Sequence, residues 1–113
     1  MEKDPKPSWI GVELDGTLAY YNGWAGAKII GDPIPSMVTK VKDLLEQGFN
    51  VKIFTWRASL DIAEEIAIPY IKAWCREHIG QELEVTNIKD IKMICLYDAQ
   101  AIPVKFNKGP MKL

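Results

Sequence analysis

Short apolar runs, separated by turn residues, recur along the chain and predict strands that alternate with helices. The first run, residues 9–14 (WIGVEL), has a β-branched centre and ends at Asp15-Gly16, as expected of a buried strand that ends in a turn. Runs of similar character predict further strands, the last of them a candidate edge strand: 50–55, 84–86, 94–97 and 102–104.

Two segments between these runs show the spacing of amphipathic helices. The first begins at Pro35, and Gly48 stands where a left-handed C-terminal cap is expected. The second is predicted to begin with Ser59 as its N-cap, to be kinked or restarted at Pro69 and to end at Gly80. Strands that alternate with helices favour a mostly parallel sheet, with ligands bound at the carboxyl ends of its strands.

Length and composition narrow the class of protein. A chain of 113 residues, 48% of them hydrophobic, suits one domain with one core, and we expect residues 1–7 and 106–113 to be loose termini. Its 14 basic and 15 acidic residues provide no overall field that would attract nucleic acid or a membrane surface. The charged, proline-rich start lacks the apolar run of a signal peptide, so we expect a cytoplasmic protein.

The two cysteines, Cys75 and Cys95, lie in apolar surroundings without CxxC spacing. They are therefore expected to be buried free thiols, as in a reducing compartment. The loop from Thr17 to Pro35 is long, aromatic and rich in glycine, and loops of this length in compact domains usually have a function. Its aromatic residues, Tyr20, Tyr21 and Trp24, are expected to order the loop at the rim of a pocket.

Polar residues at the strand ends supply the candidate chemistry. Glu13 and Asp15 follow the first strand and Asp98 follows a later one, so three carboxylates are expected in one crevice, where they would need a cation. Oxygen ligands of this kind suit Mg²⁺, whereas zinc is disfavoured because the only histidine, His78, lies on the second helix. Thr55 could donate its hydroxyl to a phosphate, with Lys89 as the balancing charge.

Taken together, several segments resemble the small, cap-poor phosphatases of the haloacid dehalogenase-like (HAD) superfamily, over about residues 9–105. The segments are IGVELDGTLAYYNGW, VKIFT with Arg57 two residues later, AWCREHIG, VTNIKD and ICLYD. The resemblance implies a three-layer α/β/α sandwich with a Rossmann-like parallel sheet and a loop-sized cap. It also implies Mg²⁺-dependent hydrolysis of a small phosphate ester.

The resemblance further implies a role for each matching position. Glu13 occupies the place of the nucleophile and Asp15 that of the general acid/base. Thr55 and Lys89 match the phosphate ligands. Glu13, Asp15 and Asp98 match the Mg²⁺ site. Three positions depart from the family pattern: Glu13 replaces an aspartate, Trp56 replaces a small residue, and Ala99 replaces the second residue of an acidic pair.

These departures change the expected chemistry. The extra methylene of Glu13 displaces the attacking oxygen by roughly 1 Å, which can cost ~10²-fold in rate, so native phosphatase activity is expected to be weakened or lost. A carboxyl group beside an indole in a partly desolvated pocket has a raised pKa and becomes a better general base.

Two alternatives to a weakened phosphatase follow. In the first, the scaffold has been repurposed, by evolution or by design, so that Glu13 removes a proton from an aromatic substrate stacked on Trp56. In the second, the chain is a non-catalytic binding module. Trp56 could equally be a packing residue, and Arg57 could bind substrate or pair with a nearby acid. The expected partner is a small molecule, and the sequence leaves the oligomeric state open.

Overall fold

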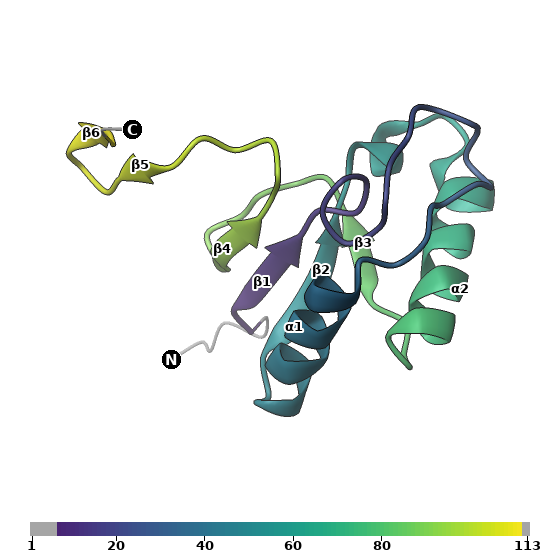
Figure 1. The fold of residues 1–113 in the computed structure, drawn as a ribbon, viewed down its shortest axis with the longest axis horizontal. Helices are drawn as coiled ribbons and strands as arrows, with labels where there is room; N and C mark the ends of the chain where they lie inside the picture. Colours follow the sequence, from purple (N-terminus) through teal and green to yellow (C-terminus); the bar gives the residue numbers. More distant parts are fainter. Residues whose placement is uncertain (1–6, 112–113) are drawn as a thin grey trace, which may run out of the picture.

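A four-stranded parallel sheet in the order β3–β2–β1–β4 forms the centre of the computed structural model, which describes residues 7–111 (Figure 1). The strands are β1 (Trp9–Val12), β2 (Asn50–Phe54), β3 (Glu84–Thr86) and β4 (Met93–Tyr97). Each neighbouring pair runs parallel. The α/β class with a mostly parallel sheet, expected from the alternation of strands and helices, is therefore confirmed.

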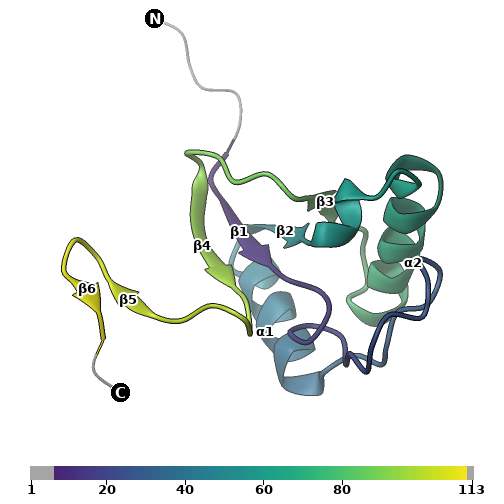
Figure 2. The ribbon, with the colours of Figure 1, turned by 90° about the horizontal axis from the view of Figure 1, so that it is seen from above.

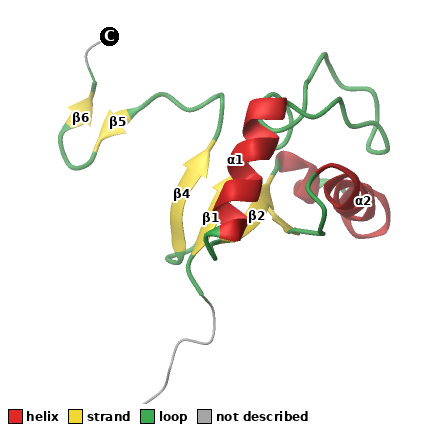
Figure 3. Ribbon diagram, turned by 60° about the horizontal axis from the view of Figure 1, so that its bottom comes forward, coloured by secondary structure: helices red, strands yellow, loops and turns green. Residues whose placement is uncertain are grey.

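The helices α1 (Pro35–Glu46) and α2 (Ile68–His78) lie on the same face of this sheet. Val12 of β1, Val41 of α1 and Ile71 of α2 belong to one continuous core of buried side chains. The topology explains this arrangement, because the steps from β1 to β2 and from β2 to β3 proceed in the same direction and right-handed crossovers then place both helices on one side. Figure 3 shows α1 lying across the strands.

The expected third layer does not form in the part of the chain that the structure describes. The return from β3 to β4 is the loop of residues 87–92, which is too short to contain a crossover helix. Asp90 of this loop accepts a hydrogen bond from the indole of Trp9, 2.9 Å away, so the loop passes near the start of β1. The described chain therefore has two layers, one of strands and one of helices.

The segment between β2 and α2 differs from the predicted single helix. It contains a 3₁₀ helix (Trp56–Ser59), capped by the Thr55 hydroxyl, and then a π-helical turn (Ala63–Ala67). The prediction that Ser59 is an N-cap is wrong. Ser59 is the last residue of the 3₁₀ helix, and its hydroxyl donates to the carbonyl of Trp56, the first residue. Pro69 does restart the helix, as the second residue of α2, where its missing N–H costs no hydrogen bond.

Residues 17–34 form the long loop expected from the sequence. The Tyr20 N–H donates to the Asp32 carbonyl at 2.7 Å, so the two arms of the loop lie side by side. The Trp74 indole of α2 donates to the Gly31 carbonyl at 3.0 Å and ties the loop to the helix layer. A Cβ on Gly31 would lie 1.8 Å from the Tyr20 carbonyl oxygen, so only glycine fits there.

The end of the chain forms a separate arm. Beyond β4 it leaves the sheet and forms a small antiparallel hairpin of β5 (Val104–Lys105) and β6 (Gly109–Pro110), which stands apart from β4 (Figure 2). The predicted edge strand at 102–104 is therefore not part of the central sheet. Residues 101–108 are exposed. Of the termini expected to be loose, 106–111 include the turn and second strand of this hairpin, whereas 1–6 and 112–113 lie outside the described residues.

β4 is one of the two edge strands of the sheet, and its position affects one cysteine. Cys75 is buried, as expected, and burial raises the pKa of its thiol to about 12. Cys95 on β4 is exposed, contrary to the prediction, because no strand lies beyond β4 in the described chain. None of the helices in the described chain is both long enough and apolar enough to cross a membrane.

We predict that Gly31→Ala destabilises the protein by roughly 3 kcal/mol, because the new methyl group meets a backbone carbonyl that cannot move independently of the loop. The control is Gly11→Ala, whose methyl group would lie 2.9 Å from the side-chain ends of Leu96 and Met93, which can shift. Urea denaturation measures both variants. Equal losses of unfolding free energy would contradict the assigned role of Gly31.

Candidate functional site

The carboxyl ends of β1 and β4 bring two acidic side chains together. The Glu13 N–H donates to the Tyr97 carbonyl at 2.9 Å, which extends the parallel pairing of the two strands by one residue. Glu13 and Asp98, the residues that directly follow β1 and β4, therefore lie next to each other, and their side chains are hydrogen-bonded. The predicted convergence of these strand ends is present in the structure.

Asp15 is held by a buried ion pair. Its two carboxylate oxygens accept hydrogen bonds from Nε and Nη2 of Arg57, both at 2.8 Å, and each side chain is almost fully buried. Gly16 follows with φ +86°, so the chain turns sharply and presents Asp15 to the end of β2. Of the two roles considered for Arg57, the structure shows pairing with a nearby acid.

Arg57 also fixes the long loop. Its Nη2 donates to the Ile29 carbonyl at 3.0 Å, and its Nη1 lies 3.5 Å from the Ala27 carbonyl. The guanidinium carbon of Arg57 lies over the Trp24 ring, 5.0 Å from the ring centroid. The centroids of the Trp24 and Trp56 rings are also 5.0 Å apart. One side chain thereby joins the end of β1, the segment after β2 and the loop that contains Trp24.

Glu13 lies in an environment that opposes its ionisation. The side chain is only 7% exposed, and its Oε2 is buried without a hydrogen-bond partner. Burial, the hydrogen bond with Asp98 and the negative charges of Asp98 and Asp15 together raise the pKa of Glu13 to about 8, whereas a hydrogen bond with Thr17 acts in the opposite direction. At neutral pH the Glu13 carboxyl group is therefore mostly protonated.

Asp98 shows the complementary shift. The hydrogen bond from Glu13 lowers the pKa of Asp98, and the Gln100 N–H, 2.8 Å from Oδ1, acts in the same direction against the effect of burial. The proton of the pair is therefore carried by Glu13 and donated to Asp98. Two carboxyl groups whose environments separate their pKa values are a common arrangement for acid–base chemistry.

The threonine and tryptophan predicted at the end of β2 have different surroundings. Thr55 is fully buried, and its hydroxyl oxygen accepts from the Arg57 N–H at 3.1 Å, so this oxygen caps the 3₁₀ helix. Trp56 is 43% exposed and forms an aromatic pair with Trp24, which is 49% exposed. Trp24 contacts Arg57 and Arg57 binds Asp15, so the aromatic pair is connected to the end of β1 through the guanidinium.

Lys89 is not brought to the carboxylates. It precedes Asp90, which is hydrogen-bonded to Trp9 at the start of β1, whereas Glu13 and Asp98 follow the carboxyl ends of their strands. Lys89 is exposed, and no ion pair between it and these acids is found in residues 7–111. The loop from β3 to β4 carries it toward the opposite end of the sheet.

The acidic residues fit a metal site only in part. Glu13 and Asp98 could each offer an oxygen to Mg²⁺, which often takes one or two protein carboxylates. Asp15, the third expected ligand, has both oxygens occupied by Arg57. Among the described residues no group of three or more His, Cys, Asp or Glu side chains is arranged to hold a metal. The three-carboxylate Mg²⁺ site implied by the resemblance is therefore not assembled.

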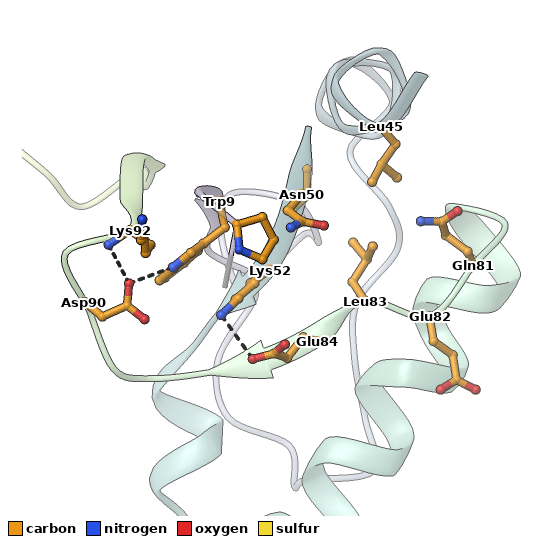
Figure 4. Close-up of a pocket in the computed structure, with 12 residues that line it drawn as sticks. Trp9, Leu45, Asn50, Lys52, Gln81, Glu82, Leu83, Glu84, Asp90 and Lys92 are labelled. Carbon is orange, nitrogen blue, oxygen red and sulfur yellow. Dashed lines mark hydrogen bonds and ion pairs between the residues drawn. The ribbon is translucent and has the colours of Figure 1, made fainter. Parts of the chain in front are cut away.

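A separate cavity of about 330 Å³ lies near the amino ends of β1 and β2 (Figure 4). Its charged groups contact one another: Lys52 is 3.2 Å from Glu84 and lies over the ring of Trp9, and the Asp90 side chain accepts from the Lys92 N–H at 2.8 Å. Glu13, Asp15 and Asp98 are remote from this cavity. The carboxyl ends of the strands remain the candidate site.

Two residues of this site were not assigned to it from the sequence. Thr17 hydrogen-bonds to Glu13 and accepts from the Ala99 N–H at 2.9 Å, so it joins the turn after β1 to the turn after β4. Its place in the motif Leu14-Asp15-Gly16-Thr17 was a usable signal. Trp24 was expected at a rim, but its contact with Trp56 spans 32 positions of sequence and has no local signature.

Comparisons with known proteins support the fold alone. No protein-family model matches the chain, and no curated protein matches it. Among solved structures, a conserved protein from Bacteroides thetaiotaomicron is similar with a TM-score of 0.60 and 22% identity, over 86% of this chain and 79% of that chain. The arrangement of strands and helices thus recurs in a bacterial protein, and the function must be inferred from the site itself.

We predict that breaking the Asp15–Arg57 pair from either side, by Asp15→Asn or Arg57→Met, costs about 3–5 kcal/mol, because each change leaves a buried polar partner uncompensated. The double variant should lose less than the sum of the two. As a matched control, Glu82→Gln removes the exposed ion pair with Arg76 and should cost at most about 1 kcal/mol. Chemical denaturation gives all four values, and similar losses at the two pairs would contradict a special structural role for the buried pair.

We also predict that the stability of the fold depends on pH through Glu13. Its pKa is about 8 in the fold against an ordinary value of 4.5, so between these pH values the folded chain binds a proton that the unfolded chain has released. The free energy of unfolding should therefore fall as pH rises from about 4.5 to about 8, by on the order of 2–4 kcal/mol, and change little above that.

Denaturation at several pH values tests this dependence. Glu13→Gln cannot ionise and should lose this part of the slope, so it should exceed the wild type in stability at pH 8.5. Glu46→Gln, an exposed change at the end of α1, should keep the wild-type slope. Equal slopes for wild type and Glu13→Gln would show that Glu13 ionises normally.

Proposed function

We propose that this chain is a HAD-like scaffold whose site transfers a proton through Glu13, acting on a small planar aromatic substrate. The observation that carries the proposal is the state of the Glu13 carboxyl group. It is buried, it has one oxygen without a partner, and it is hydrogen-bonded to Asp98. A polar oxygen left unpaired in this way is costly to the fold, and such groups are often retained for their reactivity.

The raised pKa of Glu13 supports acid–base work near neutral pH. A general base is most useful when its pKa lies near the operating pH, because it is then both ionised often enough and basic enough. With a pKa of about 8, Glu13 is a far stronger base than an exposed glutamate. Asp98 would stay ionised and receive the hydrogen bond of Glu13 whenever Glu13 is protonated.

The exposed tryptophans connected to the site through Arg57 suit an uncharged or weakly charged aromatic substrate. Trp24 and Trp56 present exposed aromatic surface at the rim, and aromatic rings bind there by offset or tilted stacking. The Arg57 guanidinium is held by Asp15 and by loop carbonyls, so it orders the rim and has little capacity left for a phosphate. The small exposed fraction of Glu13 favours a small substrate.

Phosphate-ester hydrolysis is the second candidate. It is favoured by the convergence of Glu13, Asp15 and Asp98, whose charges influence one another as the HAD resemblance implies. Mg²⁺ would supply charge neutralisation for a bound phosphate in such a site. The engagement of Asp15 by Arg57 and the remote position of Lys89 make this candidate the weaker one. A non-catalytic binding module would use the same tryptophans without turnover.

We predict that the protein opens a nitro-substituted benzisoxazole, a planar substrate whose carbon-bound hydrogen is acidic. The kcat/KM value should rise about tenfold per pH unit below pH 8 and level off above it, because this ratio follows the ionisation of the free enzyme. Glu13→Gln should lose roughly 10²-fold or more, and Glu46→Gln should retain full activity. Trp56→Ala should mainly raise KM, since it removes binding surface and leaves the base in place.

The same preparations should be assayed with an aryl phosphate, with Mg²⁺ and with a chelator. The proposal expects benzisoxazole turnover to survive chelation. Phosphate release that requires Mg²⁺ and increases in Glu13→Asp would replace it with the phosphatase reading. Absence of turnover with both substrates would leave only a binding function.

A further inference from the structure

The arm that follows β4 exposes apolar side chains in the pattern of a strand. Ile102, Val104 and Phe106 are 78%, 63% and 88% exposed. Ile102 and Val104 are two residues apart, a spacing that places side chains on one side of an extended strand, whereas Phe106 lies in the turn between β5 and β6. Within residues 7–111, none of the three belongs to the hydrophobic core. The arm therefore carries apolar side chains that are uncovered.

The hairpin at the end of this arm has little stability of its own. Each of its strands is two residues long, and the pairing joins Val104 to Pro110 and Lys105 to Gly109. An isolated two-stranded hairpin is at best marginally stable in water, even when it is longer than this one. Only one edge of β5 is used in the hairpin, so its other edge is open to a further strand.

The outer edge of β4 is a suitable surface for such an arm. β4 pairs with β1 on one side only, and within the described chain no strand lies on its other side. Ile94 is 55% exposed and Cys95 is also exposed, so apolar side chains accompany the open backbone edge. Unpaired edges of this kind readily accept a strand from another chain.

The surface area of the chain agrees with a missing partner. A folded monomer of 12.8 kDa is expected to expose about 6,300 Å², whereas this chain exposes 7874 Å². The excess, roughly 1,600 Å², is more than the ~800 Å² that each partner contributes to an interface of standard size. Residues 101–108 of the arm are all exposed and contribute to this excess.

We propose that the apolar arm of one copy binds along the open edge of β4 in a second copy, and that the second arm binds the first copy in return. Each chain carries both the arm and the edge, so a two-fold symmetric dimer satisfies both at once and closes the assembly. In the structure the arm leaves its own β4 and extends away from the sheet, which places it for a neighbouring molecule (Figure 1). This association does not depend on the proposed catalytic function.

The direct test is the mass of the full-length protein in solution between 1 and 200 µM, measured by light scattering. The wild type should form a dimer. Val104→Lys or Phe106→Ser in the arm and Ile94→Lys on the edge should each raise the dimer dissociation constant at least ~30-fold. Ile29→Lys, a comparable exposed change on the long loop, should leave it unchanged. Circular dichroism checks that each variant is folded.

A mixing experiment separates exchange between copies from folding back of the arm on its own β4. A Val104→Lys chain keeps an intact edge and an Ile94→Lys chain keeps an intact arm, so an equimolar mixture should form heterodimers with one good contact while each variant alone stays monomeric. A wild type that is monomeric at 200 µM, a dimer that tolerates the arm and edge changes, or a mixture without heterodimers would each overturn the proposal.

Discussion

The buried pair of Asp15 and Arg57 is the contact on which the architecture of the site depends. Asp15 follows β1, Arg57 belongs to the 3₁₀ helix after β2, and the remaining guanidinium hydrogens hold carbonyls of the long loop. Burying two opposite charges is favourable only when their hydrogen bonds are well formed. The three segments that supply these hydrogen bonds must therefore keep their positions relative to one another. The pair also engages both oxygens of Asp15, whereas one oxygen of Glu13 has no hydrogen-bond partner.

The buried carboxyl group of Glu13 lowers the stability of the fold. A carboxyl group with an unpaired buried oxygen destabilises the fold at alkaline pH, and a hydrophobic side chain of similar size would avoid the penalty. Asp98 moderates the cost by accepting the proton's hydrogen bond, and Thr17 connects the two turns that carry the acids. Under the proposed function, this cost would be the usual trade-off between stability and reactivity.

The sequence predicted the elements better than their assembly. Pro35, Gly48 and Pro69 act locally, so the ends of the helices were predictable, as were the carboxylates at the strand ends. The pairing of Asp15 with Arg57, the distance of Lys89 from the acids and the contact of Trp24 with Trp56 depend on how distant segments meet, and no local pattern encodes them. The prediction of a third layer was wrong for a similar reason, because the short loop between β3 and β4 leaves no residues for a helix.

The position of β4 in the sheet has a further consequence, for the order in which the protein folds. β1 and β2 are joined by a crossover, as are β2 and β3, whereas β1 pairs with β4 between Trp9 and Met93, 84 positions apart in the sequence. Closing so long a loop costs the most entropy, and such contacts slow folding. β4 is therefore the strand expected to join last, and the Glu13–Asp98 pair forms only when the sheet is complete. On a ribosome, the site would come into existence only after Asp98 has been made.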